Sequence, residues 1–477
     1  MTKRKKRRRR RHSKRWYIGM RNRIIFGCIV ALLLWGIIVG IVKLVQVIET
    51  AVHPKAVVEQ QVDPNAIVVP DFMKKYDNQE ISSYFVYGPH MNIKGSFTSE
   101  QSVRNVFLYL LTNDSESPAS YTSRKILQYD SEAQSFSSGT IINQGLSLET
   151  LEPGYYYLML AVTYSDNSVD YYNLKDASGE EELSYYTLTD VKTGTNRVVT
   201  ITNESGFMAI HVKEATLPEN VYDVVVDAGH GGSDVGATRG SEYERDLVLQ
   251  VAQETKYLLE QAGYKVLLTR DGSEPNDAMM AYTMYDPDGR VNMACGSMAK
   301  YAISIHMNSN ENVSAGGVQM YCSVRGDTTF AKYLADQVVG ATGTSYSSME
   351  TGYVEKGVYH NPYTLDTLAE ATDHAQRKGY EPYNIDTNTD YLFMIRELGG
   401  IATNAYVDGR NPEYGTNEYL SSNYGVESCL TEIGFMSVDA DLGNVKANHA
   451  NYATGLANGI MKQIEEAQNE DSIVTAK

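Results

Sequence analysis

The pattern of apolar and polar positions divides the chain into three parts. Ile24–Val42 is a run of 19 residues without a charged side chain. Residues 82–215 then show short β-branched and aromatic runs separated by Asn, Asp, Ser and Gly, a pattern typical of strands and turns. After Pro218, apolar strands alternate with amphipathic helical stretches, as in an α/β layer structure. The pattern predicts a spanning segment, an all-β domain and an α/β domain, in that order.

The uncharged run is long enough to cross a membrane, because its 19 residues at about 1.5 Å each span a hydrocarbon core of about 30 Å. Residues 1–23 contain 13 Lys or Arg and no acid, so the positive-inside rule places them in the cytoplasm. A cleaved signal peptide, a nucleic-acid-binding or nuclear basic patch, and a buried core helix are the alternatives. We expect a cytoplasmic head at 1–23, a transmembrane helix at 24–48 and a juxtamembrane linker at 49–80.

The strand-rich part predicts a β-sandwich-like, immunoglobulin-like domain over residues 81–216. The segment Leu151–Leu158 reads LEPGYYYL, similar to the turn-then-strand signature of such sandwiches. Its tyrosines fit core and cross-strand packing, and a binding face is the alternative. No group of residues in this part forms a catalytic constellation.

The α/β pattern predicts a domain over residues 220–467, an open twisted sheet with flanking helices, followed by a tail at 468–477. Strands are expected at Val221–Asp227, Tyr264–Thr269, Tyr301–Ile305, Val318–Cys322 and Glu427–Thr431. Helices are expected at Glu244–Ala262, where Gly263 serves as a C-cap, at Ala331–Val339 and at Asn451–Glu466.

Charge narrows the choice of partners. Beyond the basic head the chain holds 29 Lys or Arg against 59 Asp or Glu, a formal charge of about −30, which argues against nucleic acid as the main partner. The four cysteines lack metal-type spacing, and Cys28 lies in the apolar run. We interpret Cys295, Cys322 and Cys429 as buried small apolar residues without disulfides.

Four polar side chains stand at strand ends or helix starts of the α/β part: His230, Glu244, His306 and Glu432. Two His and one carboxylate with an open fourth position form the ligand set of a catalytic zinc site. In an open α/β sheet the carboxyl ends of the strands gather along one edge, where distant residues meet. Singly, each residue also fits a structural role, and spacing alone does not assemble the set. A phosphate cradle around His230 is disfavoured, because neither GxGxxG nor Gly-Lys-Ser/Thr is present.

Five motifs in order carry a family resemblance: VVVDAGHGGSDVGA, ERDLVLQVA, GYKVLLTR, ISIHMNS and LTEIGFMS. Over about 221–465 they resemble the catalytic domain of the zinc-dependent N-acetylmuramoyl-L-alanine amidases of family 3. The resemblance implies that His230, Glu244 and His306 bind Zn²⁺ and that Glu432 is the catalytic acid/base. Glu242 is the weaker candidate ligand, because the family's Glu-Lys-Asp followed by aliphatic residues aligns with Glu244.

The resemblance implies a peptidoglycan hydrolase that cleaves the amide between the lactyl group of N-acetylmuramic acid and L-alanine. A degenerate domain that binds the cell wall or regulates other proteins, and a zinc peptidase acting on the stem peptide, are the rival functions. The chain departs from the family in an extra segment around residues 400–425, which is expected to flank the substrate groove. His360 and His374, in the same variable stretch, are expected to be surface histidines.

Overall fold

The structure is a computed structural model. It describes residues 69–469, except 88–89, 138–145, 149–150, 177–181, 191–194, 205–206, 215–220, 276–288, 298, 312–314, 325, 327, 379–384 and 399–425. The expected transmembrane helix and basic head, Cys28, and the extra segment around residues 400–425 therefore lie outside the described residues. Among the residues that are described, no helix is both long and apolar enough to cross a lipid bilayer.

The first described part of the chain is built from strands, as the sequence predicts, together with two 3₁₀ turns. The turns are η1 (Met73–Lys75) and η2 (Pro118–Ser120). The strands are β1 (Asn78–Tyr87), β2 (His90–Ser96), β3 (Val103–Thr112), β4 (Ser123–Asp130), β5 (Ser135–Ser137), β6 (Leu146–Ser147), β7 (Gly154–Tyr164), β8 (Val169–Asp176), β9 (Glu182–Asp190), β10 (Thr195–Glu204) and β11 (Phe207–Glu214). The first strand thus begins three residues before the expected domain start at 81.

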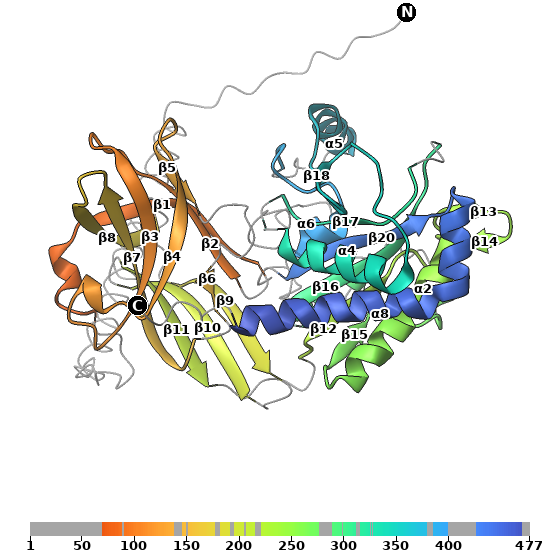
Figure 1. The fold of residues 1–477 in the computed structure, drawn as a ribbon, viewed down its shortest axis with the longest axis horizontal. Coiled ribbons are helices and arrows are strands. Elements are labelled where there is room, and N and C mark those ends of the chain that lie inside the picture. Colours follow the sequence, from red (N-terminus) through yellow and green to blue (C-terminus); the bar gives the residue numbers. More distant parts are fainter. Residues whose placement is uncertain are drawn as a thin grey trace, which may run out of the picture. The chain divides into compact units, whose positions relative to one another are not determined.

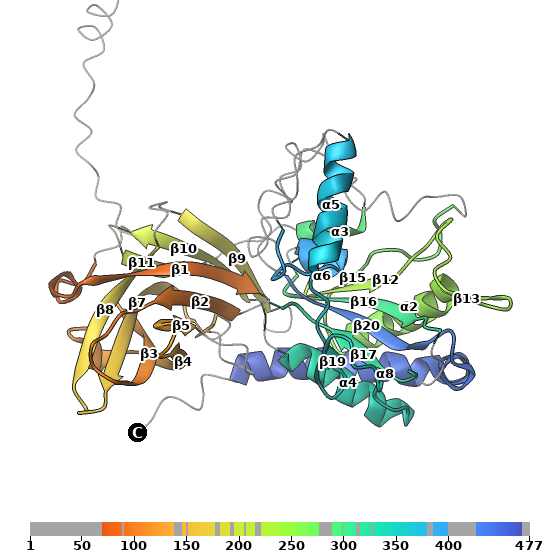
Figure 2. The same cartoon turned by 90° about the horizontal axis from the view of Figure 1, so that it is seen from above.

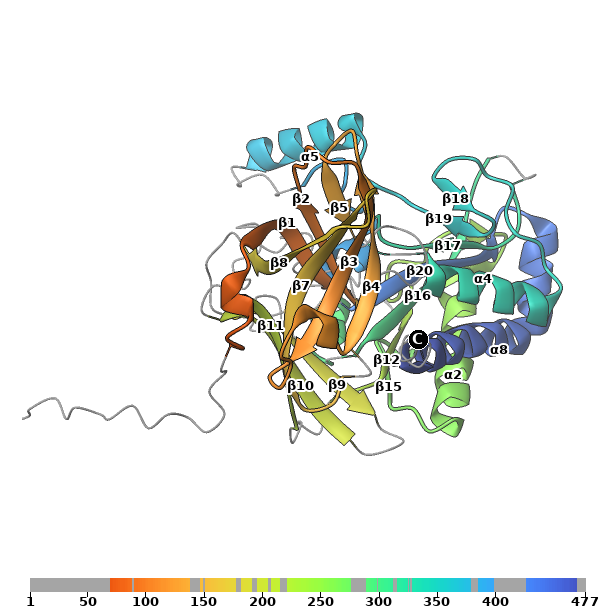
Figure 3. The same cartoon turned by 60° about the vertical axis from the view of Figure 1, so that its left-hand side comes forward.

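These strands belong to one continuous sheet rather than to the two separate sheets expected of a sandwich. The order is β3-β4-β5-β2-β1-β8-β7-β11-β10-β9, and β3 also pairs with β7, so seven of the strands close into a ring. Figure 3 shows β3 between β4 and β7. Strand-by-strand alternation sets which side chains face inward, but the closing β3–β7 pairing joins segments that are distant in sequence. The alternation therefore predicted the strands and not the closure.

The second described part begins at Val221 and alternates strands with helices. Its strands are β12 (Val224–Ala228), β13 (Thr238–Arg239), β14 (Glu242–Tyr243), β15 (Val266–Leu268), β16 (Tyr301–Asn308), β17 (Gln319–Tyr321), β18 (Tyr353–Glu355), β19 (Val358–Tyr359) and β20 (Glu427–Phe435). Its helices are α2 (Glu244–Gln261), α3 (Arg290–Gly296), α4 (Thr329–Thr342), α5 (Leu365–Lys378), α6 (Phe393–Leu398) and α8 (Asp439–Asn469). The prediction of an α/β domain with flanking helices is confirmed.

The main sheet of this domain has the order β15-β12-β16-β20-β17-β19-β18 (Figure 1). Strands β15, β12, β16 and β20 are parallel, and β17 runs antiparallel to β20. The four parallel strands therefore bring their carboxyl ends to one edge of the sheet. His230 lies just beyond the end of β12, and His306 and Glu432 lie near the ends of β16 and β20.

Helices cover both faces of this sheet, as Figure 2 shows, with α3 and α6 on one face and α4 and α8 on the other. On β16, the odd-numbered residues Tyr301, Ile303, Ile305 and Met307 pack into the core cluster that includes side chains of α2, α4 and α8. Ala302, an even-numbered neighbour, belongs instead to the cluster with α3 and α6. This period-2 alternation places the even-numbered Ser304, His306 and Asn308 on the α3/α6 face.

Several elements extend beyond their predicted bounds. Strands β16 and β20 continue to Asn308 and Phe435, so His306 and Glu432 lie within strands rather than after them. The closing helix begins at Asp439, twelve residues earlier than expected, and departs from helical angles at Asn448. Its polar first turns carry few apolar residues, but Leu442 and Val445 are buried in the core. Tertiary packing of these two side chains therefore stabilises helical turns that the local sequence pattern does not predict.

Candidate metal centre

His230 lies in the glycine-rich loop that follows the fully buried strand β12. Its backbone has φ of +60°, a left-handed conformation that is uncommon for a residue with a side chain. Gly231 and Gly232 continue with φ of +128° and +56°. The loop thus reverses sharply at the edge of the sheet, which requires the surrounding structure to hold it in place.

Two buried arginines fix this loop by its carbonyl groups. Arg270 donates from Nε to the carbonyl of Ala228 at 2.8 Å and from Nη2 to that of Gly229 at 2.9 Å. Arg290 donates from Nη2 to the carbonyl of His230 at 2.6 Å. Three consecutive carbonyls therefore accept hydrogen bonds from charged donors, and such hydrogen bonds are stronger than those between neutral groups. This arrangement sets the position of the His230 ring.

Asp227 holds Arg290 from beneath the loop and is completely buried. Its carboxylate accepts from Arg290 Nη1 at 3.1 Å and from the hydroxyls of Ser304 and Thr269, each at 2.5 Å. Burial opposes ionisation of Asp227, but the charge of Arg290 and these hydroxyl donors lower its pKa. The buried charge is thus fully paired, as burial requires.

Glu244 enters the site from the first residue of α2, with its side chain almost fully buried. Its Oε2 accepts from the backbone N–H of Ala237 at 2.8 Å, and its Oε1 accepts from that of Met307 at 2.9 Å. A carboxylate at a helix N-terminus also interacts favourably with the helix dipole. Both oxygens are therefore fixed before any ligand binds.

Two glycines leave room for the imidazole rings. A Cβ atom at Gly229 would lie 2.4 Å from Nε2 of His306, and one at Gly236 would lie 2.7 Å from Cδ2 of His230. Gly236 also has φ of +66°. A side chain at either position would push a ring away from its place. The glycines of the motif therefore serve close packing around the histidines as well as the sharp turn.

The side chains of His230, Glu244 and His306 converge on one point. Oε1 of Glu244 lies 3.0 Å from Nε2 of His230 and 3.1 Å from Nδ1 of His306. The two ring nitrogens lie 3.2 Å apart. Ligands about 2.0–2.1 Å from a tetrahedral zinc ion are about 3.3 Å from one another. The three donor atoms therefore fit one face of such a site, and together they form a group able to hold a metal ion.

The cluster also carries the charge pattern of a cation site. Burial of Glu244 opposes its ionisation, but hydrogen bonds with His230 and His306 lower its pKa well below the usual range. Burial of His230 disfavours its charged form, yet hydrogen bonds to Glu244 and Asp234 raise its pKa. The carboxylate is thus ionised at neutral pH and attracts positive charge to this point. A divalent cation supplies that charge directly.

Glu432 lies in the strand next to His306, on β20. The register of the parallel strands β16 and β20 makes Glu432 the partner of His306, so both side chains stand on the same face of the sheet. Burial and the negative charge of Glu244 raise the pKa of Glu432 well above the usual range. Its Oε2 is buried and has no hydrogen-bond partner among the described residues. A buried carboxyl group with a perturbed pKa beside a candidate metal site is a candidate general acid/base.

Comparison with known proteins identifies the fold family. The model of the family described as N-acetylmuramoyl-L-alanine amidase matches residues 224–465, about half of the chain. The chain belongs to this family. The expected resemblance is therefore confirmed, and its span contains all four predicted site residues.

Individual amidases match over shorter stretches. LytC of Bacillus subtilis, an N-acetylmuramoyl-L-alanine amidase, is 26% identical over 184 residues, which cover 37% of this chain and 35% of LytC. AmiA of Escherichia coli is 35% identical over 130 residues, 25% of this chain and 42% of AmiA. The solved catalytic domain of CwlV from Bacillus (Paenibacillus) polymyxa var. colistinus is 18% identical to this chain, with a TM-score of 0.33. That match covers 51% of this chain and 99% of the CwlV domain. The matches to LytC and AmiA each cover less than half of the length of those relatives.

Asp234 is a residue of the amidase domain that the sequence analysis did not single out. Its Oδ2 lies 2.9 Å from Nδ1 of His230, and its Oδ1 accepts from the N–H of Gly236 at 3.1 Å. A carboxylate on the second ring nitrogen fixes the tautomer and orientation of a ligating histidine. Its place four residues after His230 within the glycine-rich motif is the signal that could have marked it.

The structure brings the three predicted ligands of the amidase domain together and sets Glu432 beside them. Glu242, the weaker candidate ligand, lies on β14 and pairs with Lys446 at 2.6 Å, away from the cluster.

The expectation that His360 lies at the surface is wrong. The ring is half-buried, its Nε2 is enclosed, and burial lowers its pKa. His374 is exposed on α5, as expected. Cys295, Cys322 and Cys429 are buried and form no disulfide among the described residues, also as expected.

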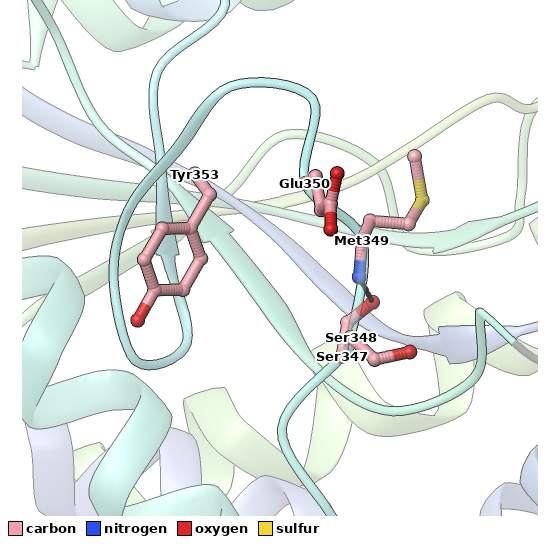
Figure 4. A pocket seen from close by; sticks show the side chains of 5 residues that line it. All are labelled: Ser347, Ser348, Met349, Glu350 and Tyr353. Atoms are coloured by element: carbon pink, nitrogen blue, oxygen red, sulfur yellow. Dashed lines mark hydrogen bonds between the residues drawn. The ribbon is translucent and has the colours of Figure 1, made fainter.

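A separate hollow lies on the same domain, lined by Ser347, Ser348, Met349, Glu350 and Tyr353 (Figure 4). Its volume is about 280 Å³, and Glu350 carries the one carboxyl group in its lining. None of the four predicted site residues lines it. Met349 contacts Asn310, which follows His306 on the next loop, with Sδ 4.0 Å from Nδ2 of Asn310. The hollow is therefore linked to the strand of His306 through a neighbouring loop.

Proposed function

We propose that this chain is a zinc-dependent N-acetylmuramoyl-L-alanine amidase that cleaves peptidoglycan between the lactyl group of N-acetylmuramic acid and L-alanine. The observation that carries this proposal is the convergence of His230, Glu244 and His306 beside Glu432, in a chain of the amidase family. Relatives named as N-acetylmuramoyl-L-alanine amidases support the same reaction.

Zinc fits the cluster by donor chemistry as well as by spacing. Two imidazole nitrogens and one carboxylate oxygen are the ligands that catalytic zinc sites use, with a further position left for water or substrate. His230 would bind through Nε2, His306 through Nδ1 and Glu244 through Oε1, because these are the atoms that converge. When bound, zinc supplies Lewis acidity, which polarises a carbonyl group and acidifies water.

Glu432 is the proposed acid/base of the reaction. Its carboxylate takes a proton from the attacking water as the water oxygen bonds to the lactyl carbonyl carbon. The same carboxyl group then delivers this proton to the nitrogen of L-alanine as the carbon–nitrogen bond breaks. The products are a lactyl carboxylate on an intact glycan strand and a stem peptide with a free amino terminus. The raised pKa of Glu432 makes its carboxylate a stronger base for the first of these two proton transfers.

A digest of purified peptidoglycan tests this function. The full chain in detergent should release stem peptides with free N-terminal L-alanine and leave muramic acid with a free lactyl carboxyl group, both identified by mass spectrometry. Chelation should stop the reaction, and added Zn²⁺ should restore it. Cleavage inside the stem peptide would instead identify a peptidase. Binding to the wall without cleavage by zinc-loaded protein would identify the degenerate module.

We also propose that residues 24–48 anchor the chain in the cytoplasmic membrane, with the amidase domain outside. The support is the uncharged run of Ile24–Val42 and the 13 basic residues ahead of it. Moving one Lys or Arg through the bilayer centre costs about 2.5–3.5 kcal/mol, so the head should stay inside. Peptidoglycan lies on the outer side of this membrane, where an anchored enzyme could reach it.

Protease added to intact, wall-stripped cells should therefore digest everything beyond about residue 50 and spare the basic head. Antibodies to the head and to the amidase domain, used on the same samples, distinguish the two ends. A protease-resistant amidase domain would contradict this orientation. A soluble mature form beginning after residue 48 would favour a cleaved signal peptide instead.

A further inference from the structure

Gln319 stands directly beside the proposed acid/base. Strand β20 runs between β16 and β17, and its Glu432 is paired with His306 on one side and with Gln319 on the other. Paired residues of neighbouring strands project from the same face of a sheet, with Cβ atoms about 4.5–5.5 Å apart in antiparallel pairs. His306, Glu432 and Gln319 therefore form a row across three strands. The residues before and after Gln319 in the chain, Val318 and Met320, belong to the core on the other face.

A hydrogen-bond chain from the backbone decides which way the Gln319 amide points. Asn308 Oδ1 accepts from the backbone N–H of Ser309 at 2.7 Å, so the other end of that amide, Nδ2, must be a donor. This Nδ2 donates to Oε1 of Gln319 at 2.7 Å. The Gln319 oxygen is thereby held toward Asn308, and its Nε2 is left to point elsewhere.

The paired residues Gln319 and Glu432 each carry a buried side-chain atom without a hydrogen-bond partner in the part of the chain that the structure describes, one a donor and the other an acceptor. Gln319 is fully buried, and among the described residues its Nε2 donor has no hydrogen-bond partner. The buried Oε2 of Glu432 is equally unpaired within that part of the chain. Buried donors and acceptors are normally satisfied, and an unpaired one calls for a functional explanation. The hydroxyls of Tyr321 and Tyr359 interact with the Gln319 side chain, which opposes the rise in pKa that burial causes in each, but neither hydroxyl makes a hydrogen bond of good geometry with Nε2.

We propose that Gln319 is a positioning residue for Glu432, donating from Nε2 to the Glu432 carboxylate and keeping it directed at the reacting atoms. Asn308 aligns the amide for this contact. The terminal torsions of Gln and Glu side chains are broad, so both groups can turn toward this contact without leaving a favoured rotamer. The inference rests on the proposed function, because it assigns Gln319 a role through Glu432.

The test compares Gln319→Met, which keeps the length of the side chain and removes its donor, with the wild-type chain. Because misplacing a catalytic group by about 1 Å costs about 100-fold, we expect kcat to fall about 10- to 100-fold. KM, bound zinc per chain and Tm should stay near their wild-type values. Asn308→Ala should lower kcat less, because it loosens the amide without removing the donor. Gln463→Met is the matched control, since Gln463 is a buried glutamine on α8, away from the site.

A second measurement separates positioning from a general structural role. In a Glu432→Gln background, Gln319→Met should cause no further fall in kcat, because the residue through which Gln319 acts is already disabled. A further fall of 10-fold or more in that background would overturn the proposal. So would kcat within 2-fold of wild type for Gln319→Met. Failure of the amidase proposal itself is distinct: it would appear as a wild-type chain that binds zinc but does not cleave peptidoglycan.

Discussion

His306→Ala is expected to abolish zinc binding and with it hydrolysis. The substitution leaves two protein ligands, His230 and Glu244, and removes the ring that packs against Gly229. Loss of a residue that merely orients a ligand already lowers metal affinity about 10- to 100-fold, so loss of a ligand should lower it further. Zinc per chain, measured after dialysis by atomic emission, should fall from about one to near zero.

The matched control is His374→Ala, because His374 is an exposed histidine on α5 of the same domain. That variant should keep both zinc and activity. Circular dichroism should show that His306→Ala retains its secondary structure, which separates metal loss from unfolding. Stoichiometric zinc together with full hydrolysis in His306→Ala would refute the assignment of the metal site.

The sequence predicted the elements of the amidase domain because their patterns are local. Helix α2 repeats apolar residues at Leu247, Val251 and Leu259 and ends before Gly263, whose φ of +94° suits a helix end. Strand β12 is a continuous apolar run, as expected of a strand with both faces covered. Such signals depend only on neighbours within a few turns. The ring closure of the β domain depends on pairing between β3 and β7, which no local signal encodes.

The sequence predicted which residues form the candidate site, but not the contacts that hold them in place. His230, Glu244, His306 and Glu432 could be named from ordered motifs. Their meeting point depends on parallel register and on contacts that act over long sequence distances, such as the hydrogen bond from Arg290 to the carbonyl of His230.

Gln319 shows the same limit in a different way. It is the one amide in the short run Val318–Cys322, a pattern that equally fits a polar residue tolerated in a core strand. Only the register beside Glu432 and the hydrogen bond from Asn308 distinguish the two possibilities.

Glu432→Gln is expected to retain zinc and lose most turnover. The amide has the shape of the carboxylate but cannot take up and return a proton, and general acid/base catalysis contributes about 10²- to 10⁴-fold. We expect kcat to fall by that factor while zinc per chain stays at about one, because none of the three converging donor atoms belongs to Glu432. Initial rates of release of new amino termini from purified peptidoglycan, together with metal analysis of the same samples, check both parts.

Glu242→Gln is the control for this experiment, because Glu242 lies two residues from a proposed ligand yet pairs with Lys446 instead. It should keep zinc and turnover. Glu244→Gln provides the opposite outcome, since its carboxylate stands between both histidines, and its loss should release the metal. If Glu432→Gln released zinc while Glu244→Gln kept it, the roles of ligand and acid/base would be exchanged. The strand register places Glu432 beside His306 but on the neighbouring strand, and the three converging donor atoms do not include its carboxylate. We therefore expect Glu432→Gln to keep zinc and Glu244→Gln to release it.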